Sequence, residues 1–120
     1  ARRNRKQMGG GMRQAGYLAA ACSYALENNV ERLRDDHRRA KELGSVLKSL
    51  SYIDRVDPIQ TNMVFFRLPD DIPAHVFLAK LKEQDVLAIS LVAQSVRMVT
   101  HLDIDDEMIE YTTKVLKGLL

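Results

Sequence analysis

The chain has 120 residues, of which 46% are hydrophobic and 28% are charged. This composition is ordinary for a globular chain and excludes a disordered one, while the length favours one domain with a modest core. The single cysteine, Cys22, excludes an intramolecular disulfide and suits a reducing compartment. No run approaches the roughly eighteen apolar residues that a membrane span needs, so we expect no membrane partner.

Positive charge is concentrated at the start of the chain. Five of the 18 basic side chains lie within the first 13 residues, with no acid among them, and the remaining 13 stand against 16 acids. The five are Arg2, Arg3, Arg5, Lys6 and Arg13. A positive field this local suits a small anion better than a long nucleic-acid track.

Three consecutive glycines, at positions 9–11, lie inside this basic segment and lead into a helical run. Glycines allow backbone N–H groups to converge on one point, and a helix N-terminus adds partial positive charge. Phosphate or carboxylate would be the natural ligand of such an arrangement. A flexible linker followed by an ordinary helix cap is the alternative that these residues leave open.

Helical periodicity predicts two helices before the first strand. The first covers residues 14–28, and its small side chains would allow close approach of a neighbouring element or subunit. The second follows an expected N-cap at Asn29, with apolar residues at spacings of three and four from Val30 to Leu50. Its opposite face carries charges of both signs, which is typical of a solvated surface.

The remaining residues alternate between strand and helix patterns. Strands are predicted at residues 52–57, 61–68, 86–90 and 95–100, with helices at about 73–84 and after the acidic residues 105–107. Paired strands with helices on one face predict an α+β fold, a two-layer sandwich in which helices pack on a mainly antiparallel sheet. We place the domain boundary after residue 29, so that residues 30–120 form a small α+β domain.

Arg97 is unusual because it lies inside an apolar strand, VRMV at residues 96–99. An arginine cannot be deprotonated, so burying it without a partner is costly. Strand alternation can direct it to solvent, or it can lie at a cleft and hold a carboxylate through two parallel hydrogen bonds. The sequence has no metal-ligand spacing, paired carboxylates, nucleophile motif or P-loop. The residues themselves therefore indicate two anion-recognition elements, no metal site and no catalytic group.

A resemblance to a known family reaches further. Residues 5–16, RKQMGGGMRQAG, resemble a signature of low-specificity L-threonine aldolases, in the β-eliminating lyase group of aspartate-aminotransferase-fold enzymes. The similarity continues at residues 25–33 (ALENNVERL), 36–37 (DH), 61–64 (TNMV) and 96–103 (VRMVTHLD). These segments follow the order and spacing of that family over nearly the whole chain.

The resemblance implies a lyase dependent on pyridoxal 5'-phosphate that reversibly cleaves L-threonine or L-allo-threonine into glycine and acetaldehyde. It also implies a cytoplasmic homotetramer that serves threonine catabolism and glycine biosynthesis. By similarity, Arg13 helps to hold the cofactor phosphate and Arg97 clamps the α-carboxylate of the amino-acid substrate.

The family's Schiff-base lysine would lie upstream of Ala1, as would the loop that holds the other side of the phosphate, the histidine stacked on the ring and the aspartate paired with its nitrogen. We therefore expect the chain to be the C-terminal part of such an enzyme, inactive by itself. In that case residues 1–29 are the end of the large cofactor domain and residues 30–120 are the C-terminal small domain.

Two other functions remain open at this stage. One is a stand-alone module that binds anions or nucleic acid, although residues 2–16 contain no Phe, Tyr or Trp on which bases could stack. The other is a non-catalytic dimerisation domain, which would use the small side chains of the first helix.

Overall fold

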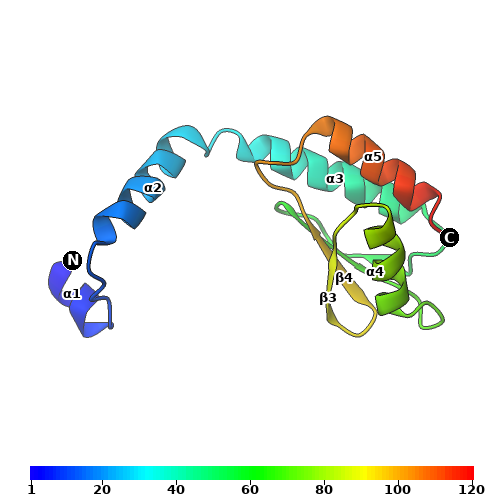
Figure 1. The fold of residues 1–120 in the computed structure, drawn as a ribbon, viewed down its shortest axis with the longest axis horizontal. Coiled ribbons are helices and arrows are strands. Elements are labelled where there is room, and N and C mark those ends of the chain that lie inside the picture. Colours follow the sequence, from blue (N-terminus) through cyan, green and yellow to red (C-terminus); the bar gives the residue numbers. More distant parts are fainter. The chain divides into compact units, whose positions relative to one another are not determined.

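The computed structural model describes all 120 residues, apart from the side chain of Leu91. The chain divides into two compact units, Ala1–Arg32 and Leu33–Leu120 (Figure 1). The assignment of residues 1–29 to the end of a larger domain stays a prediction.

The first unit consists of two helices, α1 (Arg2–Gln7) and α2 (Ala15–Asn28), and neither contains a buried residue. The sequence pattern did not predict α1. Helix α2 has nearly its predicted bounds, but the prediction that Asn29 caps the following helix is wrong. Asn29 is the C-cap of α2, because its N–H donates to the carbonyl of Ala25 at 2.9 Å.

The second unit contains seven elements in the predicted order of helices and strands. They are α3 (Leu33–Ser49), β1 (Arg55–Val56), β2 (Met63–Arg67), α4 (Ala74–Glu83), β3 (Ile89–Val92), β4 (Ser95–Val99) and α5 (Asp106–Lys117). The predicted strand at residues 52–57 is reduced to two residues, and the one predicted at 86–90 begins only at Ile89. Among the described residues, no helix has both the length and the apolar content to cross a membrane.

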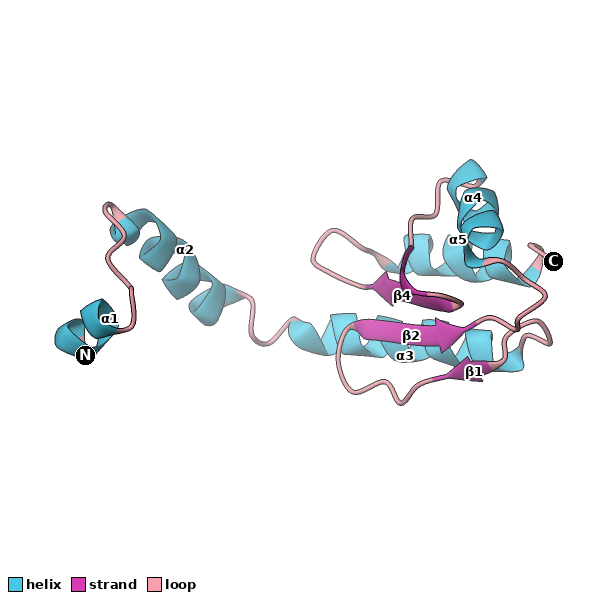
Figure 2. Ribbon diagram, turned by 90° about the horizontal axis from the view of Figure 1, so that it is seen from below, coloured by secondary structure: helices cyan, strands magenta, loops and turns pink.

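The four strands form one antiparallel sheet in the order β1-β2-β4-β3. Figure 2 shows β1, β2 and β4 side by side, with the helices α4 and α5 beyond β4. The central pair, β2 and β4, is in register along all five residues of each strand, from Met63 opposite Val99 to Arg67 opposite Ser95. The predicted α+β fold with helices on a mainly antiparallel sheet is confirmed.

Three helices cover a single face of this sheet. Side chains alternate along a strand, so Val64 and Phe66 of β2 and Val96 and Met98 of β4 face the same side. They join one hydrophobic cluster with buried residues of α3, α4 and α5. The helical members are Ala40, Leu43, Leu47, Phe77, Leu81, Ile109 and Leu116. Burial of these apolar side chains is the main source of stability for the second unit.

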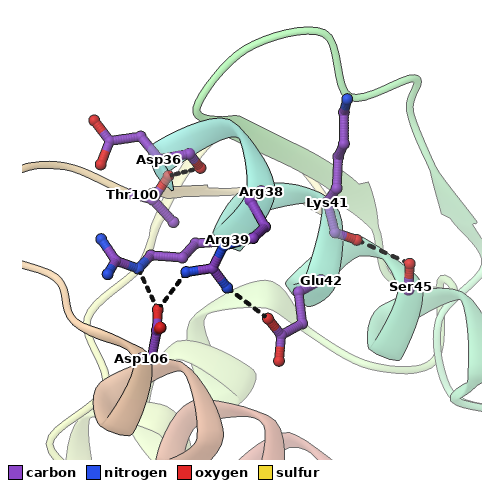
Figure 3. A network of polar contacts seen from close by, with 8 residues as sticks. All are labelled: Asp36, Arg38, Arg39, Lys41, Glu42, Ser45, Thr100 and Asp106. Carbon is purple, nitrogen blue, oxygen red and sulfur yellow. Dashed lines mark hydrogen bonds and ion pairs between the residues drawn. The ribbon is translucent and has the colours of Figure 1, made fainter. Parts of the chain in front are cut away.

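A polar network also joins α3 to the start of α5 (Figure 3). Arg38 and Arg39 each donate to Oδ1 of Asp106 at 2.7 Å. These hydrogen bonds hold the pKa of the Asp106 carboxyl below its ordinary value. Asp105 caps α5 by accepting a hydrogen bond from the N–H of Met108 at 2.8 Å. The helix therefore begins with acids, as the sequence predicts, and lies beside α3.

Candidate functional site

The glycine segment is folded back on α1. The N–H groups of Gly9, Gly10 and Gly11 donate to the carbonyls of Lys6, Arg5 and Gly9, at 3.2, 2.8 and 3.0 Å. A side chain at position 10 would meet Cγ of Arg5 at 2.6 Å and the Arg5 carbonyl oxygen at 2.9 Å, so glycine is favoured there. These glycine N–H groups are therefore engaged within the segment. They do not form the anion cradle that the sequence suggested as one possibility.

Arg13 and the first turn of α2 are the features of this unit that suit an anion. Arg13 is exposed and precedes Gln14, the N-cap of α2, which has a left-handed backbone with φ of 51°. No side chain caps this helix, and its first turn carries no acid. A guanidinium beside an uncapped helix N-terminus has the donors and the positive charge that a phosphate group requires.

Strand β4 directs Arg97 away from the core, because its neighbours Val96 and Met98 are buried on the other face. Phe65 of β2 and Ile89 of β3 lie directly opposite Arg97 on its two sides. Arg97 is half-buried, and its Nε is fully buried without a hydrogen-bond partner. An unpaired buried donor on a charged group is costly, so this arrangement suits an anionic acceptor from outside the unit.

The residues that follow Arg97 are fixed by segments that are distant in the sequence. The hydroxyl of Thr100 donates to the carbonyl of Asp36 in α3 at 2.7 Å, and both residues are buried. The side-chain amide of Asn62 donates to the carbonyl of Thr100 at 2.7 Å, and the N–H of Thr100 donates back to the Asn62 carbonyl. These bonds hold the end of β4 against β2 and α3, and so support the backbone that carries Arg97.

Sequence reasoning did not identify Asn62 and Thr100 as site-supporting residues. The available signal was that Asp36, Asn62 and Thr100 each lie in a segment of the family resemblance. The spatial meeting of these separate segments is visible only in the fold.

The histidines do not form a metal site in the described part of the chain, which holds no group of three or more His, Cys, Asp or Glu residues able to bind an ion. His101 is exposed, and its Nδ1 lies 3.6 Å from the carboxylate of the nearby Asp103. A groove of about 720 Å³ also lies beside α5, with Met98, Met108 and Tyr111 in its wall. Arg97 does not line it, so the groove is separate from the candidate anion site.

Arg13 and Arg97 belong to different units. Arg13 lies beside the N-terminus of α2 and Arg97 lies within the sheet, and their roles as anion-binding residues stay predictions. Neither unit by itself contains both residues.

Comparison with known proteins identifies the family. Residues 1–69 match the beta-eliminating lyase family, and the chain belongs to that family. It is 42% identical over 106 residues to the low specificity L-threonine aldolase of Escherichia coli K12, covering 88% of this chain and 30% of that protein. It is 37% identical over 110 residues to the probable low-specificity L-threonine aldolase 2 of Arabidopsis thaliana, covering 89% and 31%.

A solved structure supports the fold. Ornithine delta-aminotransferase of Plasmodium falciparum is 18% identical, with a TM-score of 0.59 over 74% of this chain and 24% of that one. The chain spans about three tenths of the length of the curated relatives that it matches. The α+β second unit is consistent with the C-terminal small domain of a larger enzyme.

Family membership implies pyridoxal phosphate as the cofactor of the complete enzyme. The donor set of this chain fits the group. Arg13 beside the uncapped turn of α2 is suited to its phosphate, and the unpaired Nε of Arg97 is suited to the carboxylate of an amino acid held near it.

Proposed function

We propose that this chain is the C-terminal part of a pyridoxal-phosphate-dependent lyase that cleaves L-threonine or L-allo-threonine into glycine and acetaldehyde in the cytoplasm. The observation that carries the proposal is the buried, unpaired Nε of Arg97 in a chain of this family. The 37% and 42% identity to proteins named as threonine aldolases favours this substrate class. By resemblance, the lysine that binds the cofactor is not among the residues of this chain, which alone would be inactive.

Arg97 would bind the substrate α-carboxylate. Its guanidinium is held in a half-buried position between Phe65 and Ile89, where exclusion of water strengthens a charge-assisted hydrogen bond. When bound, pyridoxal phosphate supplies the electron sink for breaking the Cα–Cβ bond. Arg97 would contribute by fixing the orientation of the amino acid, so that this bond is correctly aligned for cleavage.

Arg13 would bind the cofactor phosphate together with the first-turn N–H groups of α2.

Helix α2 is rich in alanine and exposes Tyr17, Leu18, Tyr24 and Leu26, so this first unit has a largely apolar helix without a buried residue. A helix that is apolar around most of its surface is normally covered. This supports burial of α2 in the complete enzyme, which by resemblance we propose to be a homotetramer.

The two arginines should have different effects in the complete enzyme. Arg97→Ala removes the carboxylate clamp, and we expect kcat/KM for L-threonine to fall by about 30- to 1000-fold, with cofactor retention nearly unchanged. Arg13→Ala should chiefly weaken retention of the cofactor. Activity is measured by acetaldehyde release, and retention by cofactor absorbance after dialysis.

Arg55→Ala is a matched control, because Arg55 is an exposed arginine of the same sheet that pairs with Asp57 at 3.1 Å. It should leave both quantities close to those of the unchanged enzyme. Equal, negligible effects of Arg97→Ala and Arg13→Ala on both quantities would contradict the two assignments.

A further inference from the structure

The groove beside α5 opens on the helical side of the sheet. Its floor consists of buried apolar side chains from four different segments of the chain: Leu43, Val86, Met98 and Ile109. Side chains alternate along a strand, so Met98 faces away from Arg97, its neighbour in β4. The groove therefore lies on the other face of the sheet from the candidate anion site.

Hydrogen bonds hold the walls of this groove. The hydroxyl of Tyr111 donates to the carbonyl of Gln84 at 3.2 Å, which joins α5 to the end of α4. Thr100, also in the wall, donates to the carbonyl of Asp36 in α3 at 2.7 Å. The fold itself thus sets the shape of the groove, as is usual for small-molecule sites, which are largely formed before their ligand binds.

The size and the apolar lining of the groove suit a small molecule. Its volume of about 720 Å³ lies within the range of about 300–1,000 Å³ that is typical of ligand pockets. Leu87 and Met108 at its edge are 77% and 48% exposed, so apolar surface remains to be covered. Methionine side chains, here Met98 and Met108, adapt readily to the shape of a ligand.

The charges around the groove favour one kind of ligand. Asp85, Asp105 and Glu107 line it, and none of its described lining residues is a lysine or an arginine. The neighbouring Asp106 is paired with two arginines of α3, whereas these three carboxylates have no ion pair in the described part of the chain. An anion would be repelled here, and a second copy would bring acids against acids. The charge pattern complements a cation.

We propose that the groove is a binding site for a small molecule that joins an apolar body to a cationic amine. The apolar body covers Met98 and Ile109 on the floor, and the amine lies among the carboxylates at the edge. Burial of apolar surface supplies most of the affinity, while the carboxylates select the charge. The inference does not rest on the proposed reaction, because every residue that it uses lies within the second unit.

Two fluorescent probes of opposite charge test the site. Dansylcadaverine has an apolar dansyl group and a primary amine, and dansyl-6-aminohexanoate has the same dansyl group and linker with a carboxylate. Each is titrated into the 120-residue chain, and the increase of dansyl fluorescence in an apolar environment gives the Kd. We expect the Kd of the amine to be lower than that of the carboxylate by about tenfold or more.

Charge-removing variants locate the site. The double variant Asp85→Asn with Glu107→Gln should raise the Kd of dansylcadaverine by about 3- to 10-fold and narrow its advantage over the carboxylate probe. Asp105 is left unchanged because it caps α5. The control is Asp71→Asn with Glu110→Gln, which makes the same change in net charge at exposed residues outside the groove. It should leave both Kd values unchanged.

The remaining outcomes would overturn the proposal. Equal Kd values for the two probes, or no saturable binding, would reject a site for amines. Equal effects of the two double variants would place the bound probe elsewhere on the chain. The amine titration is repeated with the complete polypeptide, where binding should persist. Loss of binding there would show that the rest of the polypeptide occupies the groove, and a dimer of the 120-residue chain that the amine dissociates in sedimentation would show that a second copy does.

Discussion

Tyr52 joins the turn after α3 to the end of α5. Its ring packs against Phe77, with centroids 6.2 Å apart, and its hydroxyl donates to the carbonyl of Leu116. Burial raises the pKa of Tyr52 from its ordinary value of 10.0 to about 12. Because the folded-state pKa is the higher one, the neutral hydroxyl contributes stability that is fully present below pH 10 and is lost as the pH rises toward 12.

Tyr52→Phe should lower the free energy of unfolding at neutral pH by about 1 kcal/mol, because it removes the hydrogen bond to Leu116. The deficit relative to the unchanged protein should narrow between pH 10 and 12, where the stability contributed by the neutral Tyr52 hydroxyl is lost. Urea unfolding across this range measures both effects. Tyr24→Phe, at an exposed position in α2, should have neither. A deficit that stays constant or widens with pH would contradict the assignment of Tyr52.

At the scale of single residues, the candidate site was only partly predictable. Arg97 is visible in the sequence as a cation within an apolar strand. The burial of its Nε is visible only in the fold, where the strand register places Phe65 and Ile89 opposite Arg97 on its two sides. The glycine segment shows the opposite case. Its composition is compatible with an anion cradle, but its N–H groups are engaged by carbonyls of α1 and of the segment itself, and the pattern did not reveal that helix.

At the scale of elements, the long periodic helices and the central strands were predictable, and the edges of the sheet were not. Strand β3 begins later than its apolar pattern suggests because Val86 is buried in the core and its N–H donates to Leu81 at the end of α4. Strand pairing therefore starts at Ile89, opposite Arg97. The residue at which an edge strand begins or ends depends on tertiary contacts, which override local β-propensity there.

Helix α3 contains a glycine where the helix passes close to the segment between β1 and β2. A side-chain carbon at Gly44 would lie 1.9 Å from Cδ1 of Ile59 and 3.4 Å from its Cγ1. Gly44→Ala would ordinarily favour the helix by about 1 kcal/mol. Here we expect the overlap to prevail and to lower the free energy of unfolding by about 1–3 kcal/mol, measured by urea denaturation.

Ile59→Val supplies the control for this steric argument, because it removes the methyl group that the new side chain would overlap. The double variant should therefore be more stable than the sum of the two single changes predicts, by about 1 kcal/mol or more. A Gly44→Ala protein as stable as the unchanged one, or additive effects in the double variant, would show that the helix tolerates the added carbon without this conflict.

At the scale of the whole molecule, the core belongs to one unit. Every member of the buried hydrophobic cluster lies between Ala40 and Leu116, within Leu33–Leu120. The helices of the unit Ala1–Arg32 contribute no buried residue, and the longer of them has only 14 residues. Isolated helices of about 12–15 residues are marginal in water, so the stability of this chain should come from the second unit.

A protein consisting of residues 33–120 should therefore unfold in urea at nearly the same midpoint as the 120-residue chain. We expect the free energies of unfolding to agree within about 0.5 kcal/mol, and the m-values to agree because the same core is exposed on unfolding. The 120-residue chain should show an additional helical circular dichroism signal, from α1 and α2, and this additional signal should be lost on unfolding without a cooperative transition. A loss of more than about 2 kcal/mol on truncation would mean that α1 and α2 support the fold as well as the proposed cofactor contact.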